Sequence, residues 1–325
     1  MTGVNINILD WIDYRPTVGV EAAHIIGLPG TGKSNMASAL AVYCMKKGEH
    51  LLIPGDRFCE WRHYLNYRKT CRVKVIIPSK KMVELTTVPE DLLEANYFIP
   101  LDDYKQLDVI KYLDDDKPTV LAVYDACFSI VDRSRLWVEI LTQLSNRTKF
   151  LDNAITVLFH EAGIYWPEMA RGDHWKYVDD FSNLFVDCRK GLVRPILVSQ
   201  LENEVESTIR GKCMVRIHRK GVGSIRLPEP LRRVIPYTAL NEYHYQYGGL
   251  YVRRNLVEYF KEKKILYKII PHRYIDGDSL PTHHLEKKSA AQLKCRNCGH
   301  IWKPRISHPL ACPDCSNYFG YDVIT

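Results

Sequence analysis

Up to about residue 235, hydrophobic residues gather in short runs that are separated by longer amphipathic stretches. The apolar runs have the length of strands and lie at residues 21–27, 50–55, 73–78, 119–125, 155–163 and 194–200. Between them, apolar side chains recur at helical spacing over residues 34–48, 135–146 and 175–191. Strands that alternate with helices predict an α/β fold, with a mainly parallel sheet covered by helices on both faces.

Other parts of the chain have a weaker pattern. Residues 56–118 are mixed, and we expect an acidic helical region near the end of this stretch. Residues 255–270 predict a helix that leads into a strand, whereas residues 276–292 collect polar and turn residues and indicate a linker. We therefore expect an α/β domain over residues 1–285, followed by the end of the linker and a small domain over residues 286–325.

The turn after the first apolar run has the composition of a phosphate-binding loop. Residues 27–34 read GLPGTGKS and match GxxxxGK[ST] at every fixed position, between a predicted strand and a predicted helix. Lys33 is expected to reach the β- and γ-phosphates of ATP, and Ser34 to ligate Mg²⁺. The predicted nucleotide-binding residues are Gly27, Pro29, Gly30, Thr31, Gly32, Lys33, Ser34 and Asn35. The alternative is a degenerate loop retained for structure.

Polar residues end three other apolar runs, at the sheet edge where parallel sheets bind ligands. Glu161 follows the run that begins at residue 155, and we expect it to position the attacking water for hydrolysis. Gln200 ends another run and is expected to contact the γ-phosphate, although it is alternatively a turn residue. Asp125 ends a third run, where it either compensates for a missing acid or, as we favour, caps the following helix.

Four cysteines near the end of the chain form two close pairs. Cys295, Cys298, Cys312 and Cys315 have the spacing C-x₂-C-x₁₃-C-x₂-C, which predicts a tetrahedral Zn²⁺ site in a small zinc ribbon. Such a short segment has too little core to fold by apolar burial alone, so the metal has a structural role. Nearby basic and aromatic residues suit nucleic acid, and a protein partner fits equally well.

Composition and charge indicate the cellular location of the protein and the kind of partner that it binds. The chain has 325 residues and a net charge of +7, which mildly favours an anionic partner such as DNA. No apolar run approaches the roughly 18 residues of a membrane span, and the amino terminus lacks a signal-peptide pattern. We therefore expect a cytoplasmic protein without membrane insertion, located in the host cytoplasm if it is viral.

The order of these motifs resembles the FtsK–HerA group of P-loop ATPases, over roughly residues 20–235. The similarity lies in the P-loop, in HEAGIYWPE after one strand and in DCRKGLVRPILVSQ around another. It is strongest with viral packaging ATPases, conjugation coupling proteins and zonula-occludens-toxin-like phage assembly proteins. The resemblance implies a RecA-like fold and a ring-forming motor, expected to be a hexamer, that moves DNA by ATP hydrolysis.

The resemblance also points to individual residues. Arg189 and Arg210 match positions where the group carries basic residues, and either is a candidate arginine finger. The alternative for each is a solvated surface residue or a contact to nucleic-acid phosphate. His160 stands where aspartate is usual in the group, which puts efficient turnover in doubt.

Two basic segments are candidate nucleic-acid contacts. Residues 57–72 interleave aromatic and basic side chains, which indicates either a nucleic-acid channel or an amphipathic helix with its aromatic residues facing inward. Residues 214–233 are similarly basic and follow the strand that ends at Gln200.

Three functions remain open from the sequence. The first is a ring-shaped, DNA-stimulated ATPase that packages a viral genome or mobilises a plasmid. The second is a weakly hydrolysing, nucleotide-gated assembly or regulatory switch, which the unusual His160 motivates. The third is a small-molecule kinase, for which the chain shows no clear arginine-rich lid or acceptor site.

Overall fold

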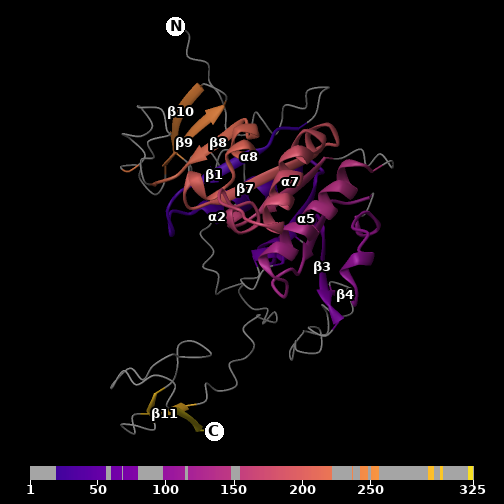
Figure 1. The fold of residues 1–325 in the computed structure, drawn as a ribbon. Helices are drawn as coiled ribbons and strands as arrows, with labels where there is room; N and C mark the ends of the chain where they lie inside the picture. The colour runs from indigo at the N-terminus through magenta and orange to yellow at the C-terminus, as the bar shows by residue number, and fades with distance from the viewer. Residues whose placement is uncertain are drawn as a thin grey trace.

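A computed structural model provides the coordinates. It describes residues 20–55, 60–67, 69–79, 98–113, 116–147, 154–221, 236, 242–247, 250–255, 292–295, 301–302 and 321–324. Figure 1 shows that most of these residues belong to one α/β body, with β8, β9 and β10 along one edge of its sheet and β3 and β4 along the other.

Ten strands form the main sheet, in the order β10-β9-β8-β1-β7-β6-β2-β5-β3-β4. They are β1 Ala23–Ile26, β2 His50–Pro54, β3 Arg72–Pro78, β4 Phe98–Leu101, β5 Thr119–Val123, β6 Ile155–Phe159, β7 Val193–Ser199, β8 Val215–His218, β9 Glu242–Tyr247 and β10 Leu250–Asn255. All neighbours from β8 to β4 pair in parallel, whereas β9 runs antiparallel to both β8 and β10. The mainly parallel sheet predicted from the sequence is confirmed.

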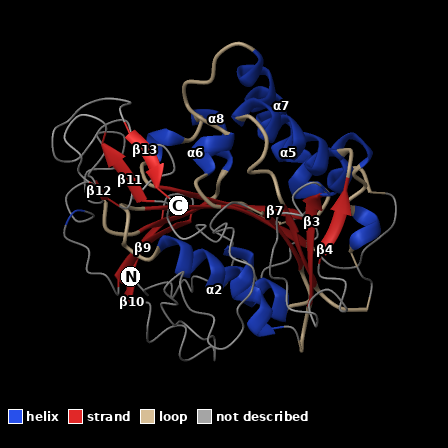
Figure 2. Cartoon of the chain, turned by 90° about the horizontal axis from the view of Figure 1, so that it is seen from below, coloured by secondary structure: helices blue, strands red, loops and turns tan. Residues whose placement is uncertain are grey.

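Helices cover both faces of this sheet. They are α2 Lys33–Lys46, α5 Ile130–Ser145, α6 Ala162–Tyr165, α7 Asp173–Lys190 and α8 Ser207–Lys212, with short 3₁₀ helices η1 Glu60–Tyr67, η2 Tyr104–Gln106, η3 Ile110–Tyr112 and η4 Glu202–Glu204. Figure 2 shows α2 on one face of the sheet and α5, α6, α7 and α8 on the other. Because both faces are covered, every residue of β2, β5, β6 and β7 is buried.

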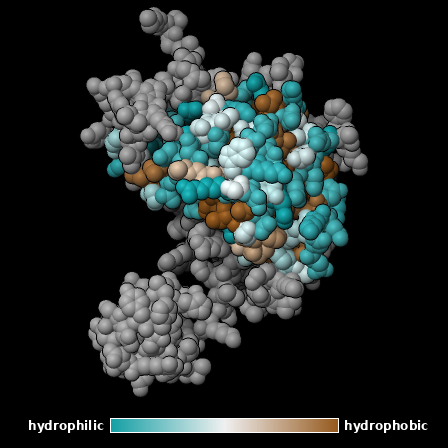
Figure 3. Space-filling model, in the orientation of Figure 1, coloured by the Kyte–Doolittle hydropathy of each residue, from teal (hydrophilic) through white to brown (hydrophobic). Residues whose placement is uncertain are grey.

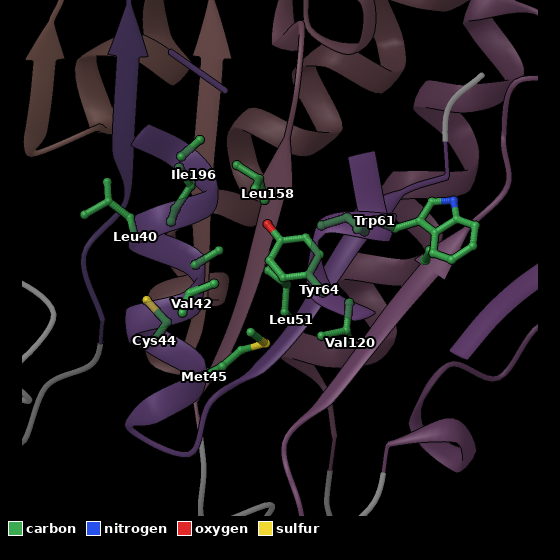
Figure 4. Packing of buried hydrophobic residues seen from close by; sticks show 14 of the residues in the cluster. Leu40, Val42, Cys44, Met45, Leu51, Trp61, Tyr64, Val120, Leu158 and Ile196 are labelled. Atoms are coloured by element: carbon green, nitrogen blue, oxygen red, sulfur yellow. The ribbon is translucent and has the colours of Figure 1, made fainter. Parts of the chain in front are cut away.

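The core on the α2 face explains one of the basic segments. One buried hydrophobic cluster contains Leu40 and Met45 of α2, Leu51 of β2, and two aromatic residues of η1, Trp61 and Tyr64 (Figure 4). Trp61 and Tyr64 are fully buried. For the described part of residues 57–72, the interpretation with inward-facing aromatic residues is therefore confirmed.

Two stretches differ from the sequence prediction. The acidic helical region expected before residue 118 is wrong for the described residues, which form the edge strand β4 and the short helices η2 and η3. The antiparallel pair β9 and β10 was not predicted. The helix expected over residues 255–270 and nearly all of the linker lie outside the described residues.

The end of the chain contains a separate three-stranded antiparallel sheet, in the order β12-β11-β13. Its strands are β11 Gln292–Cys295, β12 Ile301–Trp302 and β13 Tyr321–Ile324. Cys295 is in β11, but the other three predicted zinc ligands lie outside the described residues. Among the residues that are described, no group of three or more His, Cys, Asp and Glu side chains could hold a metal ion. The Zn²⁺ site and the domain boundary stay predictions.

The described surface is mostly hydrophilic on the face seen in Figure 3, with a few hydrophobic patches. None of the described helices has the length and apolar character that a membrane span needs.

A buried ion pair connects strands at the amino end of the sheet. Arg194 of β7 and Glu49, just before β2, have fully buried side chains and lie 3.0 Å apart. Thr156 of β6 donates a hydrogen bond of 2.7 Å to the same carboxylate. The Glu49 carboxylate also keeps the pKa of Arg194 raised, against the effect of burial. Removing one partner would leave the other charge buried and uncompensated.

We expect Glu49→Gln to lower the free energy of unfolding by about 3–5 kcal/mol, because Arg194 would keep its buried charge and lose its counterion. Glu139→Gln is the matched control, since Glu139 is half exposed and pairs with Arg135 at 3.8 Å on the surface of α5. It should cost less than about 1 kcal/mol. Urea unfolding of both variants measures the difference, and equal stabilities would contradict the prediction.

Candidate nucleotide-binding site

The pairing of three strands places the candidate residues at one edge of the sheet. β7 lies between β1 and β6, with Ile26 opposite Ser199 and Phe159 opposite Leu197. All three strands are parallel, so their carboxyl ends point the same way. The phosphate loop after β1, Gln200 after β7 and the turn after β6 therefore meet at this edge, as the sequence predicted.

A buried side-chain contact also joins β1 to β7. Nε2 of His24 lies 2.7 Å from Oγ of Ser199, and that hydroxyl donates to the carbonyl oxygen of Leu201. The hydroxyl proton is therefore used, so His24 donates from Nε2. Burial, followed by the charges of His218 and Arg216, holds the pKa of His24 well below its ordinary value. The imidazole is thus a neutral structural link between the two strands.

The loop between β1 and α2 has the backbone that phosphate binding requires. Gly30 and Gly32 have φ angles of 75° and 82°, which side chains other than glycine rarely adopt. A Cβ added at Gly30 would meet no atom within 4 Å, so the loop is open on that side. Pro29 and Gly30 are exposed, and α2 begins directly after the loop at Lys33. A positive helix end with an open glycine turn fits a triphosphate.

Lys33 lies within reach of both the loop and two carboxylates. Its Nζ donates to the carbonyl oxygen of Leu28 at 3.0 Å. Burial lowers the pKa of Lys33, while the negative charges of Glu204 and Glu161 oppose that effect. The predicted phosphate-binding lysine and the predicted catalytic acid are therefore close enough to interact electrostatically.

Glu161 has an unusual backbone conformation. Its φ and ψ are both 51°, in the left-handed region, directly before α6. A residue other than glycine pays about 1–3 kcal/mol for such a conformation, which is common at functional sites. Glu161 lines an open pocket of about 410 Å³ together with Gln200, Glu204 and Glu168. Sequence reasoning thus identified two of these polar residues and missed Glu168 and Glu204.

The short helix α6, which follows Glu161, is fixed by contacts with α7 and with Asp125. Trp166 stacks on Phe181 of α7 with ring centroids 3.9 Å apart. The hydroxyl of Tyr165 donates to Oδ2 of Asp125 at 2.9 Å, and Nε1 of Trp137 donates to the same oxygen at 2.8 Å. These contacts fix α6, and with it the position of Glu161.

The expected cap role of Asp125 is wrong. Asp125 is fully buried between α5 and α6, and Ser129 caps α5 by accepting a hydrogen bond from the backbone N–H of Asp132. Burial raises the pKa of Asp125, while its bonds to Trp137 and Tyr165 oppose that effect. The side chain of Asp125 therefore stabilises α6 through the hydrogen bond from Tyr165.

Glu204 contacts the segments that follow β7 and β6, which carry the predicted catalytic residues Gln200 and Glu161. Its Oε2 accepts a hydrogen bond of 2.7 Å from the backbone N–H of Gln200. Gly163, two residues after Glu161, packs against Glu204 so closely that an added Cβ would lie 2.9 Å from the Glu204 Cβ. Glu204 lies four residues after Gln200, and this short separation was the only feature of the sequence that could indicate their hydrogen bond. His160, in the turn beside Glu161, is half-buried.

The two candidate arginine fingers lie in different surroundings. Arg210 of α8 is nearly buried, donates to the carboxylate of Glu168 at 2.9 Å and donates to the carbonyl oxygen of Glu202 at 2.8 Å. These contacts are within one chain, so they oppose a finger role in this conformation. Arg189 is in the last turn of α7 and pairs with Glu21 at 2.9 Å, at the amino end of the sheet. Both finger roles stay predictions.

Together, the fold and the glycine loop before α2 define a P-loop NTPase architecture. The plasmid coupling protein TrwB, solved with ADP and Mg²⁺, superposes with a TM-score of 0.51 at 9% identity over 78% of this chain and 87% of TrwB. The unbound form of this bacterial conjugative coupling protein has a TM-score of 0.51 and 10% identity, over 72% of this chain and 84% of TrwB. The fold expected from the FtsK–HerA resemblance is thus confirmed.

The remaining comparisons found a weaker structural similarity and no sequence match. The genome packaging NTPase B204 of Sulfolobus turreted icosahedral virus 2 superposes with a TM-score of 0.45 at 9% identity, over 72% of this chain and 96% of B204. No protein-family model matches the sequence. No curated protein sequence matches it either.

We expect Gly163→Ala to lower the free energy of unfolding by about 1–3 kcal/mol, because the new methyl group would displace Glu204. Gly211→Ala is the matched control, since a Cβ there meets no atom within 4 Å and the position is helical. It should be neutral or stabilise by up to about 1 kcal/mol. Thermal unfolding of both variants tests the contact, and equal midpoints would exclude it.

Proposed function

We propose that this chain is an ATP-hydrolysing DNA motor of the FtsK–HerA type. The observation that carries the proposal is that Glu161, directly after β6, lies at the same sheet edge as the phosphate loop after β1, with β7 between the two strands. A binding protein needs the phosphate loop alone, whereas hydrolysis also needs a group that orients water. The shared fold of the coupling protein TrwB supports the same function.

Each site residue has a role in this proposal. Lys33 and the loop amides hold the phosphates, and the hydroxyl of Ser34 ligates Mg²⁺, which supplies positive charge against the phosphate oxygens. Glu161 orients the water, and its fixed backbone keeps the carboxylate at the sheet edge. Gln200 contacts the γ-phosphate from the strand between them, while Glu204 holds the backbone of Gln200.

The assembly and partners follow from the resemblance. We propose a ring, with a hexamer as the expected form, that acts on DNA in genome packaging or plasmid mobilisation. Arg189 is then the better finger candidate, because its side chain is 46% exposed whereas that of Arg210 is 7% exposed. The terminal zinc ribbon would contact nucleic acid or a protein partner, in a cytoplasmic setting.

His160 favours a second candidate function. An aspartate at this position would be expected to help hold the metal, and an imidazole replaces it. A nucleotide-gated switch with little hydrolysis fits that replacement. Slow turnover combined with tight, ATP-dependent binding of a partner would favour the switch over the motor.

The motor predicts ATP hydrolysis that duplex DNA stimulates. Lys33→Ala should abolish nucleotide binding and hydrolysis, because it removes the charge that holds the phosphates. Glu161→Gln should retain binding and lose about a hundredfold or more in turnover. Glu139→Gln, on the surface of α5, is the control. Phosphate release with and without DNA measures these effects, and wild-type turnover by Glu161→Gln would exclude the assigned role.

The zinc ribbon predicts one bound Zn²⁺ per chain. Cys298→Ser with Cys315→Ser should remove the metal and unfold the terminal segment, since the metal supplies most of its stability. Elemental analysis and limited proteolysis measure both effects. Cys127→Ser, an exposed cysteine of the α/β body, is the control. A full zinc content in the double variant would contradict the prediction.

A further inference from the structure

Arg219 lies directly beneath the phosphate loop, although it is far from the loop in sequence. It follows β8, and its backbone N–H donates to the carbonyl oxygen of Ile26 at 2.7 Å, which extends the pairing of β8 with β1. The next residue, Lys220, accepts a hydrogen bond of 2.9 Å from the N–H of Leu28. The chain after β8 therefore runs along the first residues of the loop.

The side chain of Arg219 is directed at one peptide group of the loop. Its Nε donates to the carbonyl oxygen of Thr31 at 2.8 Å, and its Nη2 donates to the same oxygen. Both Arg219 and Thr31 are buried. A guanidinium holds such a fork more rigidly than an ammonium, because its donors are fixed in one plane.

The planar trans peptide bond links the direction of the Thr31 carbonyl group to that of the Gly32 N–H. In a trans peptide, the C=O and the following N–H point in opposite directions, and no cis peptide occurs in the described chain. Because Arg219 holds the carbonyl oxygen of Thr31, the N–H of Gly32 is directed away from Arg219. In the proposed site, a phosphate in the loop would accept a hydrogen bond from this N–H. Gly30 and Gly32, on either side of Thr31, have φ angles of 75° and 82°, and glycine itself restricts its backbone little, so the contact with Arg219 adds to the few bonds that fix this peptide.

We propose that Arg219 is a positioning residue for nucleotide binding, which orients the Thr31–Gly32 peptide so that its N–H faces the phosphates. The inference rests on the proposed nucleotide site. Gly27 fits the same arrangement, since a Cβ there would lie 2.7 Å from the Cβ of Arg219. The positive charge of Arg219 is repelled by the positive amino end of α2. A bound triphosphate would offset this repulsion.

Arg219→Lys tests the proposal, because lysine keeps the charge and loses the planar fork. We expect the Kd for ATP with Mg²⁺, measured by calorimetry, to rise by about tenfold or more. KM should rise in parallel, while kcat at saturating ATP stays within about threefold, because the lost interaction concerns binding. Circular dichroism and thermal unfolding without nucleotide confirm that the variant is folded.

Arg133→Lys is the matched control. Arg133 also donates to backbone carbonyls of a loop, those of Phe128 and Ala126 at 3.2 and 3.0 Å, after a different strand. Its Kd for ATP should stay within about twofold of the wild type. If Arg219→Lys does not fold, Arg219→Gln replaces it, because its amide keeps a donor but lacks the guanidinium fork, and it should raise Kd similarly.

The outcomes separate this inference from the proposed function. A wild-type chain that binds no ATP would overturn both. ATP binding by the wild type with an unchanged Kd in folded Arg219→Lys, or in Arg219→Gln where that variant replaces it, would overturn the positioning role alone. A raised Kd in Arg219→Lys with an unchanged Kd in Arg133→Lys supports it.

Discussion

The hydrogen bonding of β7 between β1 and β6 is the constraint on which the candidate site depends. It sets three parallel carboxyl ends side by side, so that the phosphate loop, Gln200 and Glu161 share one edge. At the opposite edge, Arg194 of β7 is fully buried against Glu49. A slip of β7 by one residue would turn Arg194 to the other face of the sheet and away from its counterion. The buried charge at one end therefore specifies the register that the site needs at the other.

Residues outside the site hold its polar groups in place. Tyr165 and Trp137 both donate to Asp125, and the stack of Trp166 on Phe181 holds α6 directly after Glu161. The edge is thus built from rigid elements, with the strained backbone of Glu161 compensated by the contacts of the helix that follows. Such support is what keeps a catalytic carboxylate within the narrow range of positions that chemistry requires.

The sequence predicted the parts of this molecule that depend on local patterns. The phosphate loop, the central strands and Glu161 follow from apolar runs that end in polar residues, and the structure places them as expected. Glu204 was missed, and Arg219 was placed among the candidate nucleic-acid contacts of residues 214–233 although it is buried against Thr31. Both positions come from contacts between segments that no local pattern reports. The pair β9 and β10 was also missed, although Gly248 and Gly249 between two alternating segments are a hairpin signal.

The charges at this edge bear on the histidine that replaces aspartate. Glu204 and Glu161 both act on Lys33, so two carboxylates already lie beside the place for the phosphates. Like charges brought together there repel one another unless a cation lies between them, so the proposed site would bind the nucleotide with Mg²⁺ rather than alone. An aspartate at position 160 would add a third negative charge, whereas a histidine adds none. With Glu204 of η4 as a second acid at this edge, His160 is compatible with the proposed hydrolytic site.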